Sequence, residues 1–302
     1  MKGQTFGAEL ELGNVDTKIK LPKCAEWDYR DYSIANSNGT ANDPKKELNR
    51  YGSEIHTKPA SSPEALVEMI ERVYKTFPRF TVNFTTSLHV HIHTPGLRDN
   101  LKKLKRVARY IHEFQEDMYY RVDPIPIPER NEFESRDAFE GAWGWYKHRK
   151  RSHQARVSPA VYSNLIHAKT PVQFYLSHAP VNIKCEPQWQ LVQRAGINLA
   201  HLWKATDTIE FRFFTMSYNL DLTLNAIRFC KYFLRAALND LEEGPGDIIN
   251  SYKLKFQEFH PYNYDMEQIW KLTNVHINGR RKAAENYAHL LNRGIIKHRD
   301  VN

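Results

Sequence analysis

The chain has 302 residues, of which 41% are hydrophobic and 12% aromatic; this is enough apolar material for a core and excludes a wholly disordered protein. No run approaches the roughly 18 apolar residues of a membrane-spanning helix, and the first residues lack an apolar segment, so we expect neither a membrane span nor a secretory signal. The 43 basic residues outnumber the 35 acidic ones, and the net charge of +8 suits an anionic ligand, either nucleic acid or nucleotide phosphates.

Three cysteines, Cys24, Cys185 and Cys230, lie far apart in the sequence. Their odd number and wide spacing favour a reducing environment over a disulfide framework, and no pair has the spacing of a zinc-binding motif. We therefore expect a cytoplasmic protein.

In the first half of the chain, polar and apolar residues alternate in several short segments, as in half-buried strands. We expect strands at residues 5–12, 27–34, 51–57 and 80–93. Ser62 followed by Pro63 has the residue types of a helix N-cap and first turn, which predicts a helix that reaches Phe77. A second amphipathic helix is expected at residues 97–121.

In the second half, a proline-rich segment at 124–128 predicts a linker, because proline cannot continue a helix. The later patterns predict a strand pair at 197–202 and 208–214, a helix at 220–241 and helices at 266–275 and 280–293. Gly244, Pro245 and Gly246 interrupt this order and mark the clearest boundary.

Three of the predicted strands carry charged or imidazole side chains at every second position. These sets are Glu9 and Glu11; His89, His91 and His93; and Glu210 and Arg212. Residues two apart on a strand share a face, and a dry core would not accept unpaired charges there. Carboxylates suit Mg²⁺ or Mn²⁺, imidazole extends the choice towards Zn²⁺, and an arginine beside a carboxylate suits phosphate next to the metal. Each set alone also fits a solvated strand face, whereas their combination in one sheet predicts a site.

Six short segments, in order, resemble the amidoligase family, which comprises carboxylate–amine ligases of the glutamine synthetase-like fold. The segments are Phe6-Gly-Ala-Glu9-Leu-Glu11, Asp31-Tyr-Ser33, Gly52-Ser-Glu54-Ile-His-Thr-Lys-Pro59, Leu88-His89-Val-His91, Arg194-Ala-Gly-Ile-Asn198-Leu199 and Thr208-Ile-Glu210-Phe-Arg212. Tyr32 stands where the family has glycine, and Thr86-Ser87 where it usually has Cys-Gly; both departures concern the substrate end. Among the members, we expect the phage type to resemble this chain most, and a phage-encoded protein would be located in the host cytoplasm.

The resemblance implies an α+β fold in which a curved antiparallel sheet forms a funnel, with helices packed on its outer face. ATP would enter at one end, and the acid and amine substrates at the other. Residues 1–243 would form the catalytic domain, and residues 247–302 a helical extension packed on the same domain.

The resemblance also implies roles for individual residues. Two or three Mg²⁺ or Mn²⁺ ions would be held by Glu9, Glu11, Glu54, His89 and Glu210. ATP would contact His91, Arg212 and Asn198, the substrates would contact Arg194 and Asp31, and catalysis would involve Arg212, Asp31 and Ser33. His56 and His93 are further candidates beside this set. The implied reaction forms an amide through an acyl phosphate and needs no covalent enzyme nucleophile.

Two other functions stay open on the sequence alone. The alternating histidines, with a glutamate as general base, suit a zinc metallohydrolase. The positive charge and the basic run Lys147–Arg151, with Trp143, Trp145 and Tyr146 as stacking surfaces, suit a nucleic-acid-binding protein, or a ligase that acts on nucleic acid. The C-terminal helices leave self-association open as well.

Overall fold

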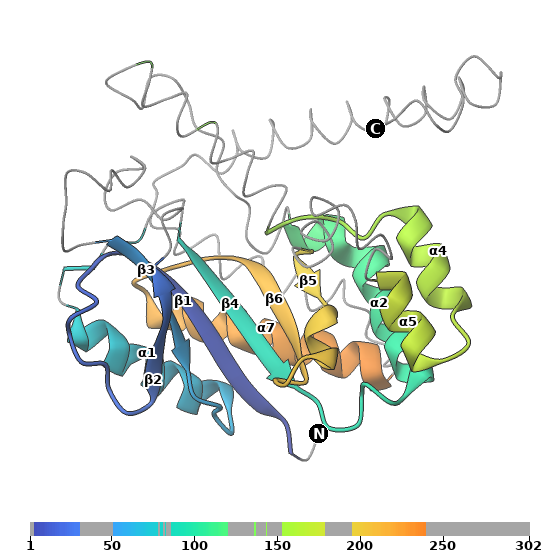
Figure 1. Ribbon diagram of the computed structural model, residues 1–302, viewed down its shortest axis with the longest axis horizontal. Coiled ribbons are helices and arrows are strands. Elements are labelled where there is room, and N and C mark those ends of the chain that lie inside the picture. Colours follow the sequence, from blue (N-terminus) through green and yellow to red (C-terminus); the bar gives the residue numbers. More distant parts are fainter. Residues whose placement is uncertain are drawn as a thin grey trace. The chain divides into compact units, whose positions relative to one another are not determined.

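The computed structural model has a mixed α+β fold, in which six strands form one antiparallel sheet and helices pack beside it (Figure 1). The structure describes residues 3–30, 51–77, 79–80, 82, 86–119, 136, 143, 153–178 and 195–239. The strands are β1 (Thr5–Val15), β2 (Ala25–Arg30), β3 (Tyr51–Thr57), β4 (Ser87–His93), β5 (Ile197–Asn198) and β6 (Thr208–Thr215). The helices are α1 (Pro63–Thr76), α2 (Leu101–Asp117), α4 (Pro159–His167), α5 (Pro171–His178), the 3₁₀ helix η3 (Ala200–Trp203) and α7 (Leu220–Asn239).

The strands lie in the order β2-β3-β1-β4-β6-β5, and each pair of neighbours is antiparallel. The register places Glu9 of β1 opposite His56 on one side and His89 on the other. On the adjoining strands, Glu210 lies opposite both His91 and Asn198. Because directly opposed residues of an antiparallel pair point to the same face, these side chains form a row across the sheet.

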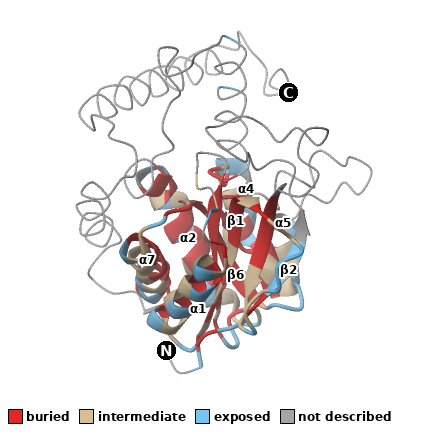
Figure 2. Ribbon diagram, turned by 90° about the vertical axis from the view of Figure 1, so that its left-hand side faces the viewer, coloured by how far each residue is buried: buried red, intermediate tan, exposed pale blue. Residues whose placement is uncertain are grey.

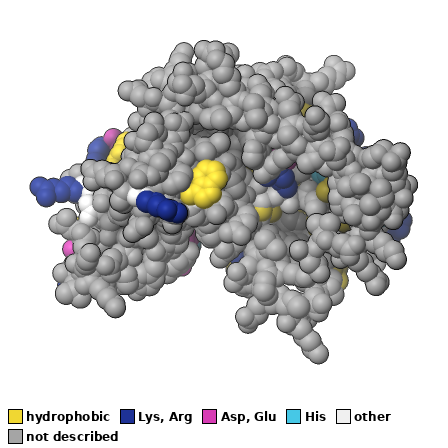
Figure 3. All heavy atoms as spheres, turned by 90° about the horizontal axis from the view of Figure 1, so that it is seen from above, with side chains coloured by type: hydrophobic (Ala, Val, Ile, Leu, Met, Phe, Trp, Pro, Cys, Tyr) yellow, Lys and Arg dark blue, Asp and Glu magenta, His cyan; other side chains and the backbone are white. Residues whose placement is uncertain are grey.

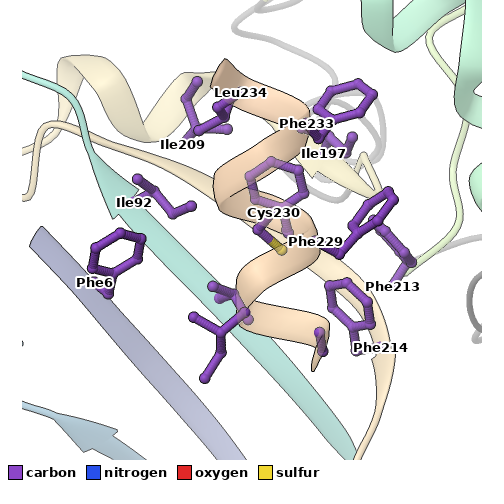
Figure 4. Close-up of a cluster of buried hydrophobic side chains, with 14 of the residues drawn as sticks. Phe6, Ile92, Ile197, Ile209, Phe213, Phe214, Phe229, Cys230, Phe233 and Leu234 are labelled. Carbon is purple, nitrogen blue, oxygen red and sulfur yellow. The ribbon is translucent and has the colours of Figure 1, made fainter. Parts of the chain in front are cut away.

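The opposite face of the sheet is apolar and is covered by helices α1 and α7, which lie behind the strands in Figure 1. Alternate residues such as Leu10, Val90 and Phe211 point to this face and are fully buried. Figure 4 shows α7 packed there through Phe229, Cys230, Phe233 and Leu234, among other buried apolar side chains. Burial of each such large side chain contributes about 1.5–3 kcal/mol. Figure 2 shows the buried residues along the strands and on parts of the helices.

Several predicted element ends are confirmed by the structure, and one of them has a capping contact. Helix α1 begins at Pro63, and the Ser62 hydroxyl accepts a hydrogen bond from the Ala65 amide. Helix α7 begins at Leu220, as expected. The strand at 51–57 has the predicted bounds. Local signals were sufficient in these places because the cap and the periodicity agree with each other.

Other predicted ends are wrong. Helix α2 begins at Leu101 rather than residue 97, because the Asn100 side chain accepts from the Lys103 amide and caps the helix there. Strand β4 begins at Ser87 rather than residue 80. The Tyr218 hydroxyl accepts from the Val82 amide and donates to the Phe80 carbonyl. These backbone groups therefore bond to a side chain and not to a neighbouring strand.

Helices α4 and α5 were not predicted, although their starts repeat the signal that identified α1. Ser158 precedes Pro159 and accepts from the Val161 amide. Thr170 precedes Pro171 and accepts from the Gln173 amide. Their helical segments are short, 9 and 8 residues, so their apolar periodicity is weak.

Several predictions fall outside the described residues and stay predictions. They concern the end of the strand at 27–34, the linker at 124–128, the basic run at 147–151, the boundary at 244–246 and the two C-terminal helices. Among the described residues, none of the helices combines the length and apolar character that a membrane crossing needs. Figure 3 shows separate groups of described hydrophobic and basic side chains on one face of the molecule.

Candidate functional site

The face of the sheet opposite α1 and α7 gathers most of the predicted functional residues. Strands β1, β3, β4, β5 and β6 contribute Glu9, Glu11, Glu54, His89, His91, Asn198, Glu210 and Arg212. Contacts among these side chains and His56 of β3 link all five strands. The sheet therefore brings together residues that are about 200 positions apart in sequence, as the i, i+2 spacing predicted.

Glu9 lies at the centre of this face. Its Oε2 is 2.7 Å from Nδ1 of His89, and its Oε1 is 2.8 Å from Nε2 of His91. His56 approaches from β3, with Nε2 at 3.7 Å from Oε1. Burial would raise the pKa of Glu9, but the imidazoles of His91 and His89 outweigh that effect and hold the pKa well below its ordinary value. Glu9 is therefore ionised at neutral pH.

Glu210 is fully buried and is held from three sides. Nη1 of Arg212 donates to Oε1 at 2.5 Å, Nδ2 of Asn198 donates to Oε2 at 2.9 Å, and Nε2 of His201 lies 3.3 Å from Oε2. Burial raises the pKa of Glu210, but the Arg212 guanidinium more than offsets this and lowers it to about 2. The carboxylate is charged, and its orientation is defined by its neighbours.

Asn198 is buried on β5, directly opposite Glu210. Its Nδ2 donates to Glu210, and its Oδ1 accepts from the Ala200 amide. The second bond turns the chain into helix η3 and ends β5 at residue 198, so the predicted strand at 197–202 is shorter than expected. Asn198 thus positions Glu210 and shapes the turn, while its contact with ATP stays a prediction.

Glu11 and Glu54 lie directly opposite each other on β1 and β3, and both are buried. Burial raises the pKa of Glu54, and the charges of Glu9 and Glu11 add to that rise, although a hydrogen bond from His56 opposes it. For Glu11, the imidazoles of His89 and His153 outweigh burial and lower the pKa. Opposed buried carboxylates repel unless a cation or proton lies near them.

The described residues contain three groups whose potential ligand atoms lie within 4.8 Å of one another. The groups are Glu11, His89 and His153; Glu9, Glu54 and His56; and Glu9, His91 and Glu210. Each combines carboxylate oxygen with imidazole nitrogen, a donor set that suits Mn²⁺ and Zn²⁺, and Mg²⁺ where carboxylates dominate. The predicted metal ligands all belong to one or more of these groups, and His56 belongs to one as well.

Two residues of the site were not predicted, His153 and His201. Neither lies in a period-2 pattern, because His153 lies in a turn and His201 in the 3₁₀ helix η3. His201 follows Asn198 by three residues, and the 3₁₀ turn directs it back to Glu210. Burial lowers the pKa of His201 to about 4, so it is neutral at physiological pH.

His153 comes from a segment that runs beside residues 195 and 196. Ala155 and Ala195 form a parallel bridge, and the Gly196 amide donates to the Ala155 carbonyl. A Cβ at Gly196 would lie 2.6 Å from the His153 carbonyl oxygen, so only glycine permits this approach. Gly196 belongs to the segment that resembles the amidoligases, but nothing local indicates which distant segment it contacts.

A cavity of about 760 Å³ opens beside Glu9 and His91. It is lined by the first half of β1, the ends of β3 and β4, and the turn before β6. Gly7, which lies opposite His91, adds no side chain to its wall, while His56, His201 and Lys204 add polar groups. The volume is within the range of sites for small molecules and cofactors.

The remaining predicted residues are Asp31, Ser33, Arg194 and His93. Asp31, Ser33 and Arg194 fall outside the described residues, so their roles stay predictions. His93 lines the cavity and approaches Asp207, with Nε2 and Oδ2 3.7 Å apart, but belongs to none of the three groups found among the described residues. The three alternating histidines are therefore divided between different neighbours.

Comparison with protein-family models finds no match, and no curated protein matches the sequence.

Proposed function

We propose that the protein is an ATP-dependent carboxylate–amine ligase of the amidoligase type. The observation that carries this proposal is the row formed by Glu9, His91 and Glu210, which joins a cavity of nucleotide size to the half-buried Arg212. This row is built from three of the six segments that resemble the amidoligases. We also propose that the described antiparallel sheet curves into the funnel that is typical of the family.

The donor set fits divalent cations. Glu9 takes part in two of the three groups, and its neighbours Glu54, His56, His91 and Glu210 complete them. The mutual repulsion of the carboxylates, which raises the pKa of Glu54 beyond the effect of burial, would be relieved by a cation. Bound Mg²⁺ or Mn²⁺ would neutralise phosphate charge during phosphoryl transfer.

Arg212 has the features of a phosphate-binding arginine. One Nη is used by Glu210, while its Nε is buried and has no hydrogen bond among the described residues. Charge from Glu210 and Glu9 outweighs burial and raises the pKa of Arg212, so it keeps its charge. A guanidinium fixed on one side by a carboxylate is pre-oriented to donate to phosphate oxygens on the other.

The proposed reaction has two steps. In the first, an oxygen of the substrate carboxylate attacks the γ-phosphorus of ATP, the bond to the β-phosphate oxygen breaks, and ADP leaves. In the second, the amine lone pair attacks the acyl carbon of the acyl phosphate, the carbon–oxygen bond breaks, and phosphate leaves with the electron pair while the nitrogen loses a proton. Arg212 would donate to the phosphoryl group in the first step and to the departing phosphate in the second.

The division of the histidines supports a ligase over a three-histidine zinc hydrolase. His89 faces Glu9 and Glu11, His91 faces Glu9 and Thr208, and His93 faces Asp207. They do not converge on one point, as ligands of a single ion must. Binding of nucleic acid through the run 147–151 stays a prediction.

The test is ADP release by the purified protein with ATP, Mg²⁺ and a panel of carboxylic acids and amines. We expect release that needs metal, an acid and an amine, and we expect Mg–ADP to raise the melting temperature. Arg212→Ala should lower turnover by about 10³-fold or more. Arg228→Ala is the matched control, because Arg228 is an arginine that binds Glu64 at the surface, away from the site. A folded protein that binds neither ATP nor ADP with Mg²⁺ would contradict the proposal.

A further inference from the structure

Glu11, His89 and His153 form a group that is sealed from the cavity. They are 5%, 1% and 7% exposed, and none of the three lines the cavity beside Glu9. They come from β1, β4 and the segment that precedes α4, so each arrives on a separate part of the chain. Such a convergence of three buried, ionisable side chains is costly unless their charges and lone pairs have a common partner.

The spacing within this group is that of ligand atoms around an ion. Oε1 of Glu11 lies 3.5 Å from Nε2 of His89 and 3.7 Å from Nε2 of His153. Both distances exceed those of a normal nitrogen–oxygen hydrogen bond. In a tetrahedral shell with bonds of about 2.0–2.1 Å, neighbouring ligand atoms lie about 3.3–3.4 Å apart, close to the spacing observed here.

The hydrogen bonding of His89 also supports a bound ion. Its Nδ1 lies 2.7 Å from Oε2 of Glu9, and a carboxylate accepts from an imidazole N–H, so Nδ1 is the donor in this bond. Metal binding requires the neutral ring, and in that form Nε2 carries the lone pair on the side of Glu11. This Nε2 is buried and has no hydrogen bond among the described residues. A histidine that donates one nitrogen to a carboxylate and offers the other to an ion is the common arrangement at zinc sites.

We propose that Glu11, His89 and His153 hold one zinc-class transition-metal ion that is separate from the exchangeable cations of the cavity side. Two imidazoles and one carboxylate select Zn²⁺ or Co²⁺ over Mg²⁺, which prefers oxygen ligands and keeps several waters. Burial away from the cavity excludes substrate from this ion, so its role is structural. The inference stands whether or not the protein is a ligase.

The ion would fasten the segment around His153 to the centre of the sheet. This segment is already held to α2, because the Gln115 side chain bonds both the amide and the carbonyl of Val157. On its other side it bridges Ala195, next to β5. Ligation of His153 would add a direct link to β1 and β4, the two central strands.

The experiment measures metal binding in the absence of nucleotide. The full-length protein is stripped with a chelator, checked by circular dichroism, and titrated with Zn²⁺ or Co²⁺ in excess Mg²⁺. We expect one equivalent of Zn²⁺ to be retained against Mg²⁺, X-ray absorption to report two imidazole ligands, and the melting temperature to rise. His153→Ala should weaken this binding at least about 100-fold, since loss of an outer partner alone costs 10–100-fold.

The control is His167→Ala, which removes an exposed imidazole that contacts its own helix. A second variant, His153→Cys, places a thiolate at the same position and should add a sulfur-to-metal charge-transfer band to the Co²⁺ spectrum. The proposal is overturned if the wild type loses Zn²⁺ to Mg²⁺, if folded His153→Ala binds Zn²⁺ as the wild type does, or if the Cys variant shows no such band. Because no nucleotide is used, absence of ligase activity would leave these results unaffected.

Discussion

The two faces of the sheet are made by alternate residues of the same strands, yet they have opposite energetic roles. On the helix-covered face, Leu10 and Val90 are buried in an apolar layer and contribute stability. On the other face, Glu11 and Glu210 are equally buried but charged, and each depends on partners to offset the loss of hydration. Burial alone therefore does not distinguish a core residue from a site residue. The interaction partners of the buried side chain distinguish the two.

The largest effect should come from Glu9, the centre of the charged face. Glu9→Gln keeps the shape but removes a ligand from two groups, so turnover should fall at least about 100-fold while the fold is retained. The measurement is ADP release alongside circular dichroism. Glu26→Gln is the control, because Glu26 is an exposed carboxylate that lines the same cavity but belongs to none of the three groups. Equal losses of turnover in Glu9→Gln and Glu26→Gln would show that Glu9 is no more important than another carboxylate that lines the cavity.

Leu10, the neighbour of Glu9, tests the apolar face. Leu10→Ala should lower the free energy of unfolding by about 2–5 kcal/mol, because it leaves a cavity beneath α1 and α7. Urea titration measures this loss. Zn²⁺ and Mg²⁺ affinities of the folded fraction should stay near those of the wild type. If Leu10→Ala instead weakened metal binding as strongly as Glu9→Gln, the two faces would not act independently.

The charged face should also show itself in the pH dependence of the metal-free protein. Burial would lower the pKa of His56, but the hydrogen bond that His56 donates to Glu54 and the charges of Glu9 and Asp28 raise it from 6.5 to about 9. A histidine with a raised pKa stabilises the fold fully below its unfolded pKa, near 6.5, and this stabilisation is lost as the pH rises through about 9. The melting temperature in chelator should therefore fall across this window.

His56→Gln should flatten that pH profile, whereas His167→Gln, at an exposed helical position, should leave it unchanged. Metal binding must displace the His56 proton, so metal affinity should rise over the same pH range. Identical profiles of melting temperature against pH for the wild type and His56→Gln would show that His56 does not offset the negative charge of the neighbouring carboxylates.

The smallest expected effect lies on neither face and concerns a helix start. Ser62→Ala removes the hydroxyl that accepts from the Ala65 amide, and should cost about 1 kcal/mol of stability without changing metal affinity. Ser61→Ala, at the exposed preceding position, provides the control in the same urea titration. A similar loss for both variants would show that the cap contributes nothing specific.

Much of the charged face was predictable because side chains two apart on a strand share a face wherever that strand lies. This rule placed Glu9 with Glu11 and Glu210 with Arg212 before any strand order was known. It failed for His153 and His201, because a turn and a short 3₁₀ helix carry no period-2 pattern. It also failed for the start of β4, where a distant Tyr218 hydroxyl binds the backbone near Phe80.

The sequence by itself determined the local geometry of this protein: the main strands, the capped start of α1 and the face that each charged residue takes. Only the tertiary structure decided that Glu9 lies between His56 and His89, and that His153 reaches Glu11. The physical reason is that periodicity and capping act within a few residues of one backbone. Strand order and register depend instead on apolar burial summed over the whole sheet, to which segments far apart in sequence contribute together.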